Sequence, residues 1–221
     1  MGDFDGARVS SRSNATRRGV LTDTVCQSAV CQNAEIDIAS VWHSVACMSD
    51  NRPGWGAQST RQVTWHDPAP ALELVRTMSG REYLTGILEG DIPAPPIAEL
   101  LGMDIVSVDE GEVVFTLPPH ESHFNPIGGV HGGILCTVLD TVTGCAAHST
   151  LEAGWRYTSI DINVSYLRGV TMESGLLTFT GRVTKGGRRV IFTSAEGVDA
   201  AGNLVATATS SLLVMPPPAA A

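Results

Sequence analysis

One stretch limits what this chain can fold into: residues 123–147, with the sequence HFNPIGGVHGGILCTVLDTVTGCAA. An Asn-Pro turn and a His-Gly-Gly step lead into an apolar run at helical spacing, and Asp140 is the one carboxylate in that run. The apolar positions form a broad stripe and the opposite side carries small residues, so we expect a helix that is buried on both sides. A buried helix with glycines at its start and one acid inside it indicates a reaction site.

Strands are predicted on both sides of this helix. Two come before it, over residues 103–108 and 112–117, and four come after it, over residues 159–166, 176–184, 189–198 and 204–215. We expect the last four to form a meander, with Tyr166 and Phe192 in the core. Only one long helix is available to cover the sheet, so the economical arrangement is an antiparallel sheet curled around that helix.

The strand after the helix shows the cleanest alternation in the chain. Period-two spacing predicts one apolar face, made of Ile160, Ile162, Val164 and Tyr166, with Ser159 on the opposite face.

The chain before residue 103 divides into two parts. Residues 1–62 lack sustained periodicity, and we expect a disordered or loosely attached extension there. Residues 63–102 predict a short helical lid or brace, with one helix that begins at Asp67-Pro68 and presents Leu72, Leu74 and Met78 on its apolar side. Residues 103–221 then form the main domain.

Composition excludes several classes of protein. A net charge of −9 argues against a nucleic-acid partner, and no apolar run is long enough to span a membrane. No secretory leader is visible, and the five cysteines include no CxxC pair, so we expect a cytoplasmic protein with reduced thiols. His120 and His123 are expected to be solvated loop residues, and we expect neither a metal nor a cofactor.

The glycines and the acid are the parts that acyl transfer requires. Gly132 and Gly133 place free backbone N–H groups at the start of the helix, where an oxyanion can bind, and Asp140 supplies a base or a nucleophile. Eight residues at ~1.5 Å rise put Gly132 and Asp140 ~12 Å apart. One copy of the helix therefore cannot use both groups on one carbonyl. We expect a twofold dimer in which Gly132 of one subunit meets Asp140 of the other.

The motif NPIGGVHGG, followed by this Asp, resembles the PaaI-like group of hotdog-fold acyl-CoA thioesterases, over residues 97–215. The resemblance implies an α+β hotdog fold, a homodimer or dimer of dimers, and no metal. It also implies a catalytic Asp140, a carbonyl-polarising Gly132 amide with His131 beside it, an orienting Asn125, and a Ser159 that helps to place water.

The residues and the resemblance together predict hydrolysis of acyl-CoA thioesters, with an aromatic group such as phenylacetyl or a short or medium chain. Lys185, Arg188 and Arg189 lie at a predicted hairpin turn and are candidate contacts for the CoA phosphates. Two alternatives stay open: a hotdog hydratase or dehydratase, and a non-catalytic acyl-CoA-binding protein.

Overall fold

The computed structural model describes residue 54 and residues 56–217, and the helices and strands of these residues lie in the unit Ser59–Ala221. The elements before the long helix are α3 (Ala69–Leu74), α4 (Gly80–Glu89), α5 (Pro96–Leu101), β1 (Asp104–Asp109), β2 (Glu112–Leu117) and the 3-10 turn η1 (Glu121–His123). From the long helix onward they are α6 (Gly132–His148), β3 (Arg156–Tyr166), the 3-10 turn η2 (Met172–Ser174), β4 (Leu177–Lys185), β5 (Val190–Val198) and β6 (Leu204–Met215). The predicted N-terminal extension lies outside the described residues as far as residue 53.

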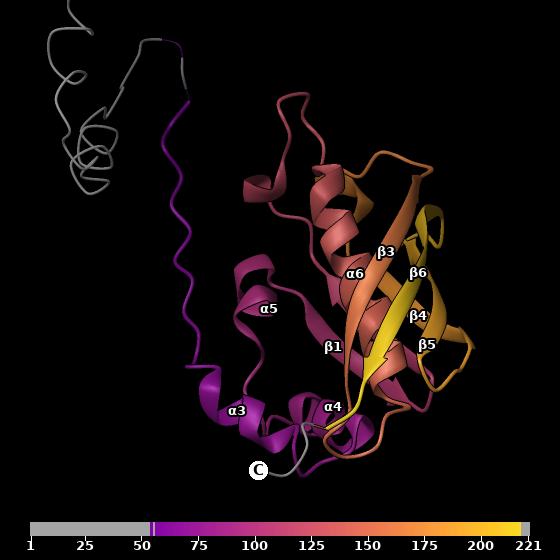
Figure 1. The fold of residues 1–221 in the computed structure, drawn as a ribbon. Helices are drawn as coiled ribbons and strands as arrows, with labels where there is room; N and C mark the ends of the chain where they lie inside the picture. The colour runs from indigo at the N-terminus through magenta and orange to yellow at the C-terminus, as the bar shows by residue number, and fades with distance from the viewer. Residues whose placement is uncertain (1–53, 55, 218–221) are drawn as a thin grey trace, which may run out of the picture. The chain divides into compact units, whose positions relative to one another are not determined.

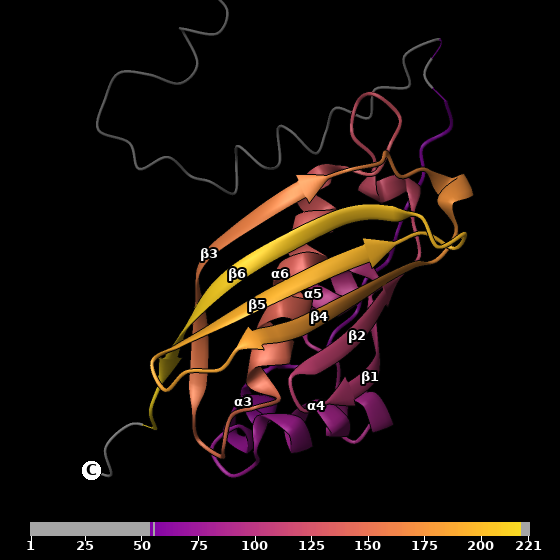
Figure 2. The ribbon, with the colours of Figure 1, turned by 90° about the vertical axis from the view of Figure 1, so that its right-hand side faces the viewer.

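The six strands form one antiparallel sheet that curls over α6, as predicted (Figures 1 and 2). Their order is β1-β2-β4-β5-β6-β3, so the predicted four-strand meander is wrong in one place. The strands β4, β5 and β6 do follow one another, but β3 pairs with β6 at the far edge instead of with β4, which pairs with β2. The chain crosses from one side of the sheet to the other through residues 167–176. As a result, β3 is an edge strand.

The core lies between α6 and the concave face of the sheet. Leu135, Val138, Leu139 and Val142 of α6 are at most 3% exposed and pack with buried apolar residues of β2 and β4. The helix backbone touches the sheet at Gly181, where a Cβ atom would overlap the Val142 carbonyl oxygen. This close approach fixes the position of α6, because no side chain separates the two backbones there.

A β-bulge changes the predicted faces of β3. Ser159 pairs with Leu212 and Asp161 pairs with Ser211, so Ile160 is an extra residue between them. Two residues of β3 therefore oppose one of β6. Beyond this point, the alternation of side chains between the two faces of the sheet is shifted by one residue. Ser159 lies on the α6 side together with Ile162, so the prediction that placed them on opposite faces is wrong.

Two aromatic residues predicted in the core are partly exposed, Tyr166 at 52% and Phe192 at 44%. Phe192 lies on the outer face of β5, whereas its neighbours Ile191 and Thr193 are buried. Tyr166 lies where β3 ends, beside the start of α6, so only part of its ring is covered.

Helix α4 packs against the other end of α6. Ser79 and Glu82 form a capping box that begins α4, and Gly80 packs so closely that a Cβ atom would overlap the His148 carbonyl oxygen. The predicted first helix is shorter than expected: α3 ends at Leu74, because the chain must turn before the α4 cap, and Leu72 is 61% exposed. Within the described residues, none of the helices has the length and apolar character needed to cross a membrane.

Candidate active site

His131 caps the start of α6. Its Nδ1 accepts a 2.8 Å hydrogen bond from the Gly133 N–H, and its carbonyl oxygen accepts one of 2.9 Å from Ile134. Among the described residues, no hydrogen bond engages the Gly132 N–H. Since the first N–H groups of a helix lack intrahelical partners and lie at the positive end of its dipole, Gly132 offers a free donor for an anionic oxygen.

Tyr166 covers one side of Gly132. Its hydroxyl donates a 2.9 Å hydrogen bond to the Gly132 carbonyl oxygen, and a Cβ atom at residue 132 would lie 3.1 Å from the ring. The two residues share an open groove of about 280 Å³, which is also lined by Val130, Leu135, Leu167, Arg168, Gly169 and Val170. This contact was not predicted from the sequence, although the period-two pattern of β3 did predict that Tyr166 lies on the side of the strand that faces the core.

The Asn125 side chain orders the loop that precedes α6. Its Oδ1 accepts hydrogen bonds from the N–H groups of Ile127, at 3.0 Å, and Gly129, at 3.2 Å. Phe124 and Val130 form a single antiparallel bridge at the base of this loop. Because the loop occupies Oδ1, the side-chain amide Nδ2 is the polar group of Asn125 that has no hydrogen-bond partner among the described residues, and Asn125 is not in the lining of either groove described here.

Asp140 lies in a second groove, about halfway along α6. The Ser159 hydroxyl donates a 2.9 Å hydrogen bond to Asp140 Oδ1, and it reaches the helix only because of the bulge in β3. The groove has a volume of about 480 Å³, and its lining also includes Cys136, Thr137, Ile160, Asp161 and Ile162. The predicted gap beside Asp140 is therefore present.

The two threonines nearest Asp140 on the helix do not donate hydrogen bonds to its carboxylate. The hydroxyls of Thr137 and Thr141 donate to carbonyl oxygens one turn earlier in the helix, at 2.9 Å each. Burial, and then the charge of Asp140, raises the pKa of the Cys145 thiol to about 12. Cys145 is thus a protonated thiol at neutral pH, so it is a poor nucleophile.

The two grooves occupy different parts of α6 and share no lining residue. Gly132 and Asp140 are eight residues apart in one continuous helix, which places them ~12 Å apart along its axis. One chain therefore does not bring Gly132 and Asp140 together in one groove.

The predicted phosphate contacts lie elsewhere on the chain. Lys185 ends β4, and Arg188 and Arg189 follow in the turn that leads to β5, where all three are exposed. Neither groove, as the described residues line it, includes any of the three. Arg168 does line the Gly132 groove, and its charge was not singled out from the sequence.

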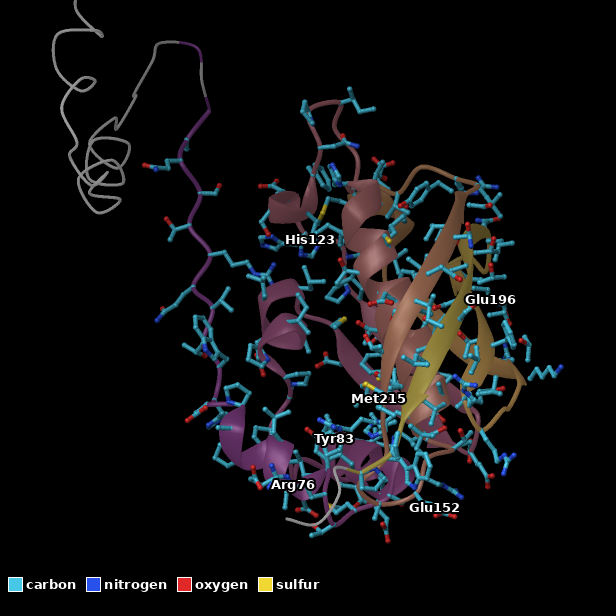
Figure 3. All side chains as sticks on the ribbon, viewed as in Figure 1. Arg76, Tyr83, His123, Glu152, Glu196 and Met215 are labelled. Atoms are coloured by element: carbon cyan, nitrogen blue, oxygen red, sulfur yellow. The ribbon has the colours of Figure 1, made fainter. Side chains whose placement is uncertain are left out.

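The two loop histidines differ in environment. His120 is exposed, but His123 is only 3% exposed, so the prediction of a solvated His123 is wrong. Figure 3 labels His123 among the side chains. The Nε2 of His123 lies 3.0 Å from Arg61 Nη1, and the carbonyl oxygen of His123 accepts the His131 N–H. Burial, followed by the charges of Arg61 and His120, lowers the pKa of His123. The described residues contain no group of three or more His, Cys, Asp or Glu side chains that could hold a metal ion.

Comparisons with known proteins find a matching family and similar sequences. A family model described as Thioesterase superfamily matches residues 127–206. Human acyl-coenzyme A thioesterase 13 is 32% identical over 127 residues, which cover 57% of this chain and 89% of the human protein.

Solved structures extend the similarity to the fold. A phenylacetic acid degradation-related protein from Ralstonia eutropha JMP134 is 34% identical, with a TM-score of 0.55 over 59% of this chain and 98% of that one. The E. coli PaaI protein is 24% identical, with a TM-score of 0.55 over 63% of this chain and 97% of that one, which supports the fold alone.

Proposed function

Because this chain belongs to the Thioesterase superfamily and is a hotdog-fold thioester hydrolase, we propose that it hydrolyses acyl-CoA thioesters with Asp140 and the Gly132 amide as its central groups. The observation that carries the proposal is the Ser159–Asp140 hydrogen bond of 2.9 Å inside an open groove. A carboxylate oriented in this way is suited to accept a proton from water.

The reaction follows from these groups. The Gly132 N–H donates to the thioester carbonyl oxygen, where negative charge develops. Asp140 takes a proton from a water molecule while the water oxygen attacks the carbonyl carbon. The C–S bond then breaks, and the proton on Asp140 passes to the departing sulfur, which leaves a free acid and CoA. Asn125 Nδ2 holds the carbonyl or the water, and Ser159 orients the Asp140 carboxylate.

Asp140 can also act as a nucleophile. In that case its oxygen attacks the carbonyl carbon and forms a mixed anhydride, which water then hydrolyses. A burst of free thiol equal to the enzyme concentration would indicate the anhydride, whereas linear release from the first turnover favours the general base.

Each site needs two subunits. The ~12 Å between Gly132 and Asp140 within α6 requires a second copy of the helix, related by a twofold axis. The edge strand β3 supports this pairing: no other strand covers its outer edge among the described residues, and Ile160 is 57% exposed. The assembly is a homodimer or a dimer of dimers.

The substrate is an acyl-CoA with an aromatic group, such as phenylacetyl, or a short or medium chain. The small side chains beside Asp140 leave room for such groups. Similarity to a phenylacetic acid degradation-related protein is a reason to test the aromatic substrate first. Lys185, Arg188 and Arg189 are proposed contacts for the CoA phosphates. Gly133, which the sequence also suggested as a contact, does not offer a free donor, because its N–H donates to His131 Nδ1.

The test is release of free thiol from phenylacetyl-CoA and from a series of straight-chain acyl-CoAs. We expect Asp140→Asn to lower kcat about 10²- to 10⁴-fold, the range for loss of a general base. Asp104→Asn is the matched control, because Asp104 is an exposed acid at the opposite edge of the sheet. Full activity in Asp140→Asn would overturn the mechanism.

The two alternatives give different results in the same assays. A binding protein retains acyl-CoA esters without releasing thiol from any of them. A hydratase or dehydratase changes the absorbance of an enoyl-CoA and leaves its thioester bond intact.

A further inference from the structure

The Gly132 amide belongs to a helix start that is flexible in itself. Gly132 and Gly133 are consecutive, and glycine loses more conformational freedom on folding than any other residue. A donor that stabilises an oxyanion must be held in place before the reaction begins. The first turn of α6 therefore needs contacts from outside the helix backbone.

Two side chains supply such contacts, and both act on one peptide group. His131 Nδ1 accepts the Gly133 N–H at 2.8 Å, and the Tyr166 hydroxyl donates to the Gly132 carbonyl oxygen at 2.9 Å. The N–H of Gly133 and the carbonyl of Gly132 belong to the same peptide group. His131 and Tyr166 thus hold opposite ends of one peptide, the one directly after the free Gly132 N–H.

Tyr166 also explains why residue 132 has no side chain. A Cβ atom there would lie 3.1 Å from Tyr166 Cζ, 3.3 Å from Cε1 and 3.4 Å from the hydroxyl oxygen. The first two distances are tighter than most Cβ contacts and the third is an ordinary van der Waals contact, so a side chain at residue 132 would require the Tyr166 ring to shift by a few tenths of an ångström. Partial burial, and then Cys136, raises the pKa of Tyr166, so the phenol keeps its proton and acts as the donor.

From this geometry we infer that Tyr166 is a positioning residue for the thioester carbonyl: its hydroxyl and ring fix the Gly132–Gly133 peptide and aim the Gly132 N–H into the groove. The inference rests on the proposed function, since it assigns the Gly132 N–H to the substrate carbonyl.

The experiment removes only the hydroxyl, with Tyr166→Phe, and measures both turnover and the binding of two acyl-CoA analogues. One analogue is a ketone, which keeps the carbonyl but replaces sulfur by CH₂, and the other is a thioether, which lacks the carbonyl. We expect kcat to fall about three- to tenfold with KM within about twofold, as for the loss of one hydrogen bond. Tyr166→Phe should weaken binding of the ketone by a similar factor and leave binding of the thioether unchanged.

Tyr83→Phe is the matched control. Tyr83 lies on α4 beside His148, at the end of α6 opposite Gly132 (Figure 3). It should leave kcat and the binding of both analogues unchanged.

Two other outcomes would overturn the inference. Equal weakening of both analogues by Tyr166→Phe would assign Tyr166 a merely structural role and overturn the inference, as would unchanged turnover and unchanged ketone binding. Failure of the proposed function appears separately, as no thiol release by the wild type. If the wild type releases no thiol, binding of the ketone and the thioether still tests the role of Tyr166. If the wild type binds the ketone no more tightly than the thioether, both proposals are overturned.

Discussion

The Ser159 hydroxyl reaches the Asp140 carboxylate, at 2.9 Å, only because β3 bulges between Ser159 and Asp161. On a regular strand, Ser159 and Ile162 would point to opposite faces of the sheet. The extra residue at the bulge brings both onto the side that faces α6. Bulges are frequent next to active sites, where they change the direction of a single side chain. This bulge directs the Ser159 side chain toward Asp140.

We predict that Ser159→Ala lowers kcat about tenfold. A hydrogen bond to a charged group contributes about 1.5–3 kcal/mol, and a part of it is replaced by water in this open groove. Ser159 is exposed, so the free energy of unfolding should change by less than about 0.5 kcal/mol. The measurements are steady-state thiol release and urea unfolding. Ser165→Ala is the control, since Ser165 lies on the same strand but lines a separate groove, and equal activity in the two variants would contradict the prediction.

The fold follows closely from local patterns in the sequence. Helical spacing from Gly132 onward predicts α6, and period-two spacing over Glu112–Leu117 and Leu204–Met215 predicts β2 and β6. Strands β2 and β6 bury one face each, so their pattern alone predicts them. The small side of α6, predicted to be buried as well, is only half-buried at Cys136, Thr137 and Thr141. The partner of β3 could not be predicted in this way, because pairing with β6 depends on contacts between segments far apart in the chain.

The candidate site was predictable in its residue types but not in its contacts. A motif singles out Gly132 and Asp140, and helical geometry alone shows that they are too far apart to share one carbonyl. The bulge leaves no local signal, because the extra residue, Ile160, continues the apolar alternation. The contact between Tyr166 and Gly132 joins residues 34 positions apart, so the sequence spacing contained no hint of it.

His148 should make stability depend on pH. Burial lowers the pKa of His148 from 6.5 to about 4, between the rings of Tyr83 and Tyr157. The unfolded chain binds a proton near pH 6.5 and the folded chain does not. The contribution is therefore fully present above pH 6.5 and is lost as pH falls toward 4. Between about pH 7.5 and pH 5 we expect a loss of about 2 kcal/mol in the free energy of unfolding.

Urea unfolding at the two pH values measures this loss. His148→Gln should reduce the difference between them, whereas His66→Gln, at an exposed histidine, should leave it unchanged. An equal pH dependence in wild type and His148→Gln would show that other groups cause it.

Arg61 should stabilise the loop before α6 through His123. Arg61 Nη1 lies 3.0 Å from His123 Nε2 and donates to Ser122 Oγ at 3.2 Å. We expect Arg61→Gln to cost about 1 kcal/mol of unfolding free energy. The same change should raise the pKa of His123 toward 6.5 without reaching it, because burial is the larger cause of the shift.

NMR titration of the histidine ring protons reads that pKa directly. Arg76→Gln is the control, since Arg76 forms an exposed ion pair with Glu73 and should contribute little. A chain that begins at residue 63 should behave like Arg61→Gln in stability and retain wild-type activity. An unchanged His123 titration in Arg61→Gln would refute the coupling.

Mixing two inactive variants tests whether each site joins two subunits. Gly132→Pro removes the N–H at a helix position that tolerates proline, and Asp140→Asn removes the base. In a mixed dimer, one site combines the intact Gly132 of one subunit with the intact Asp140 of the other. Random exchange of equal amounts makes half the dimers mixed, each with one intact site of two, so about a quarter of wild-type activity should return.

Gly132→Ala is the matched control for proline, because it adds the same Cβ against Tyr166 but keeps the N–H. It should retain more activity than Gly132→Pro, because only the proline removes the donor. Exchange of subunits is followed by native mass spectrometry on the same samples. If mixed dimers form and no activity returns, Gly132 and Asp140 do not act on one carbonyl across the interface. Because they lie ~12 Å apart in a single helix, the proposed composite site would then be wrong.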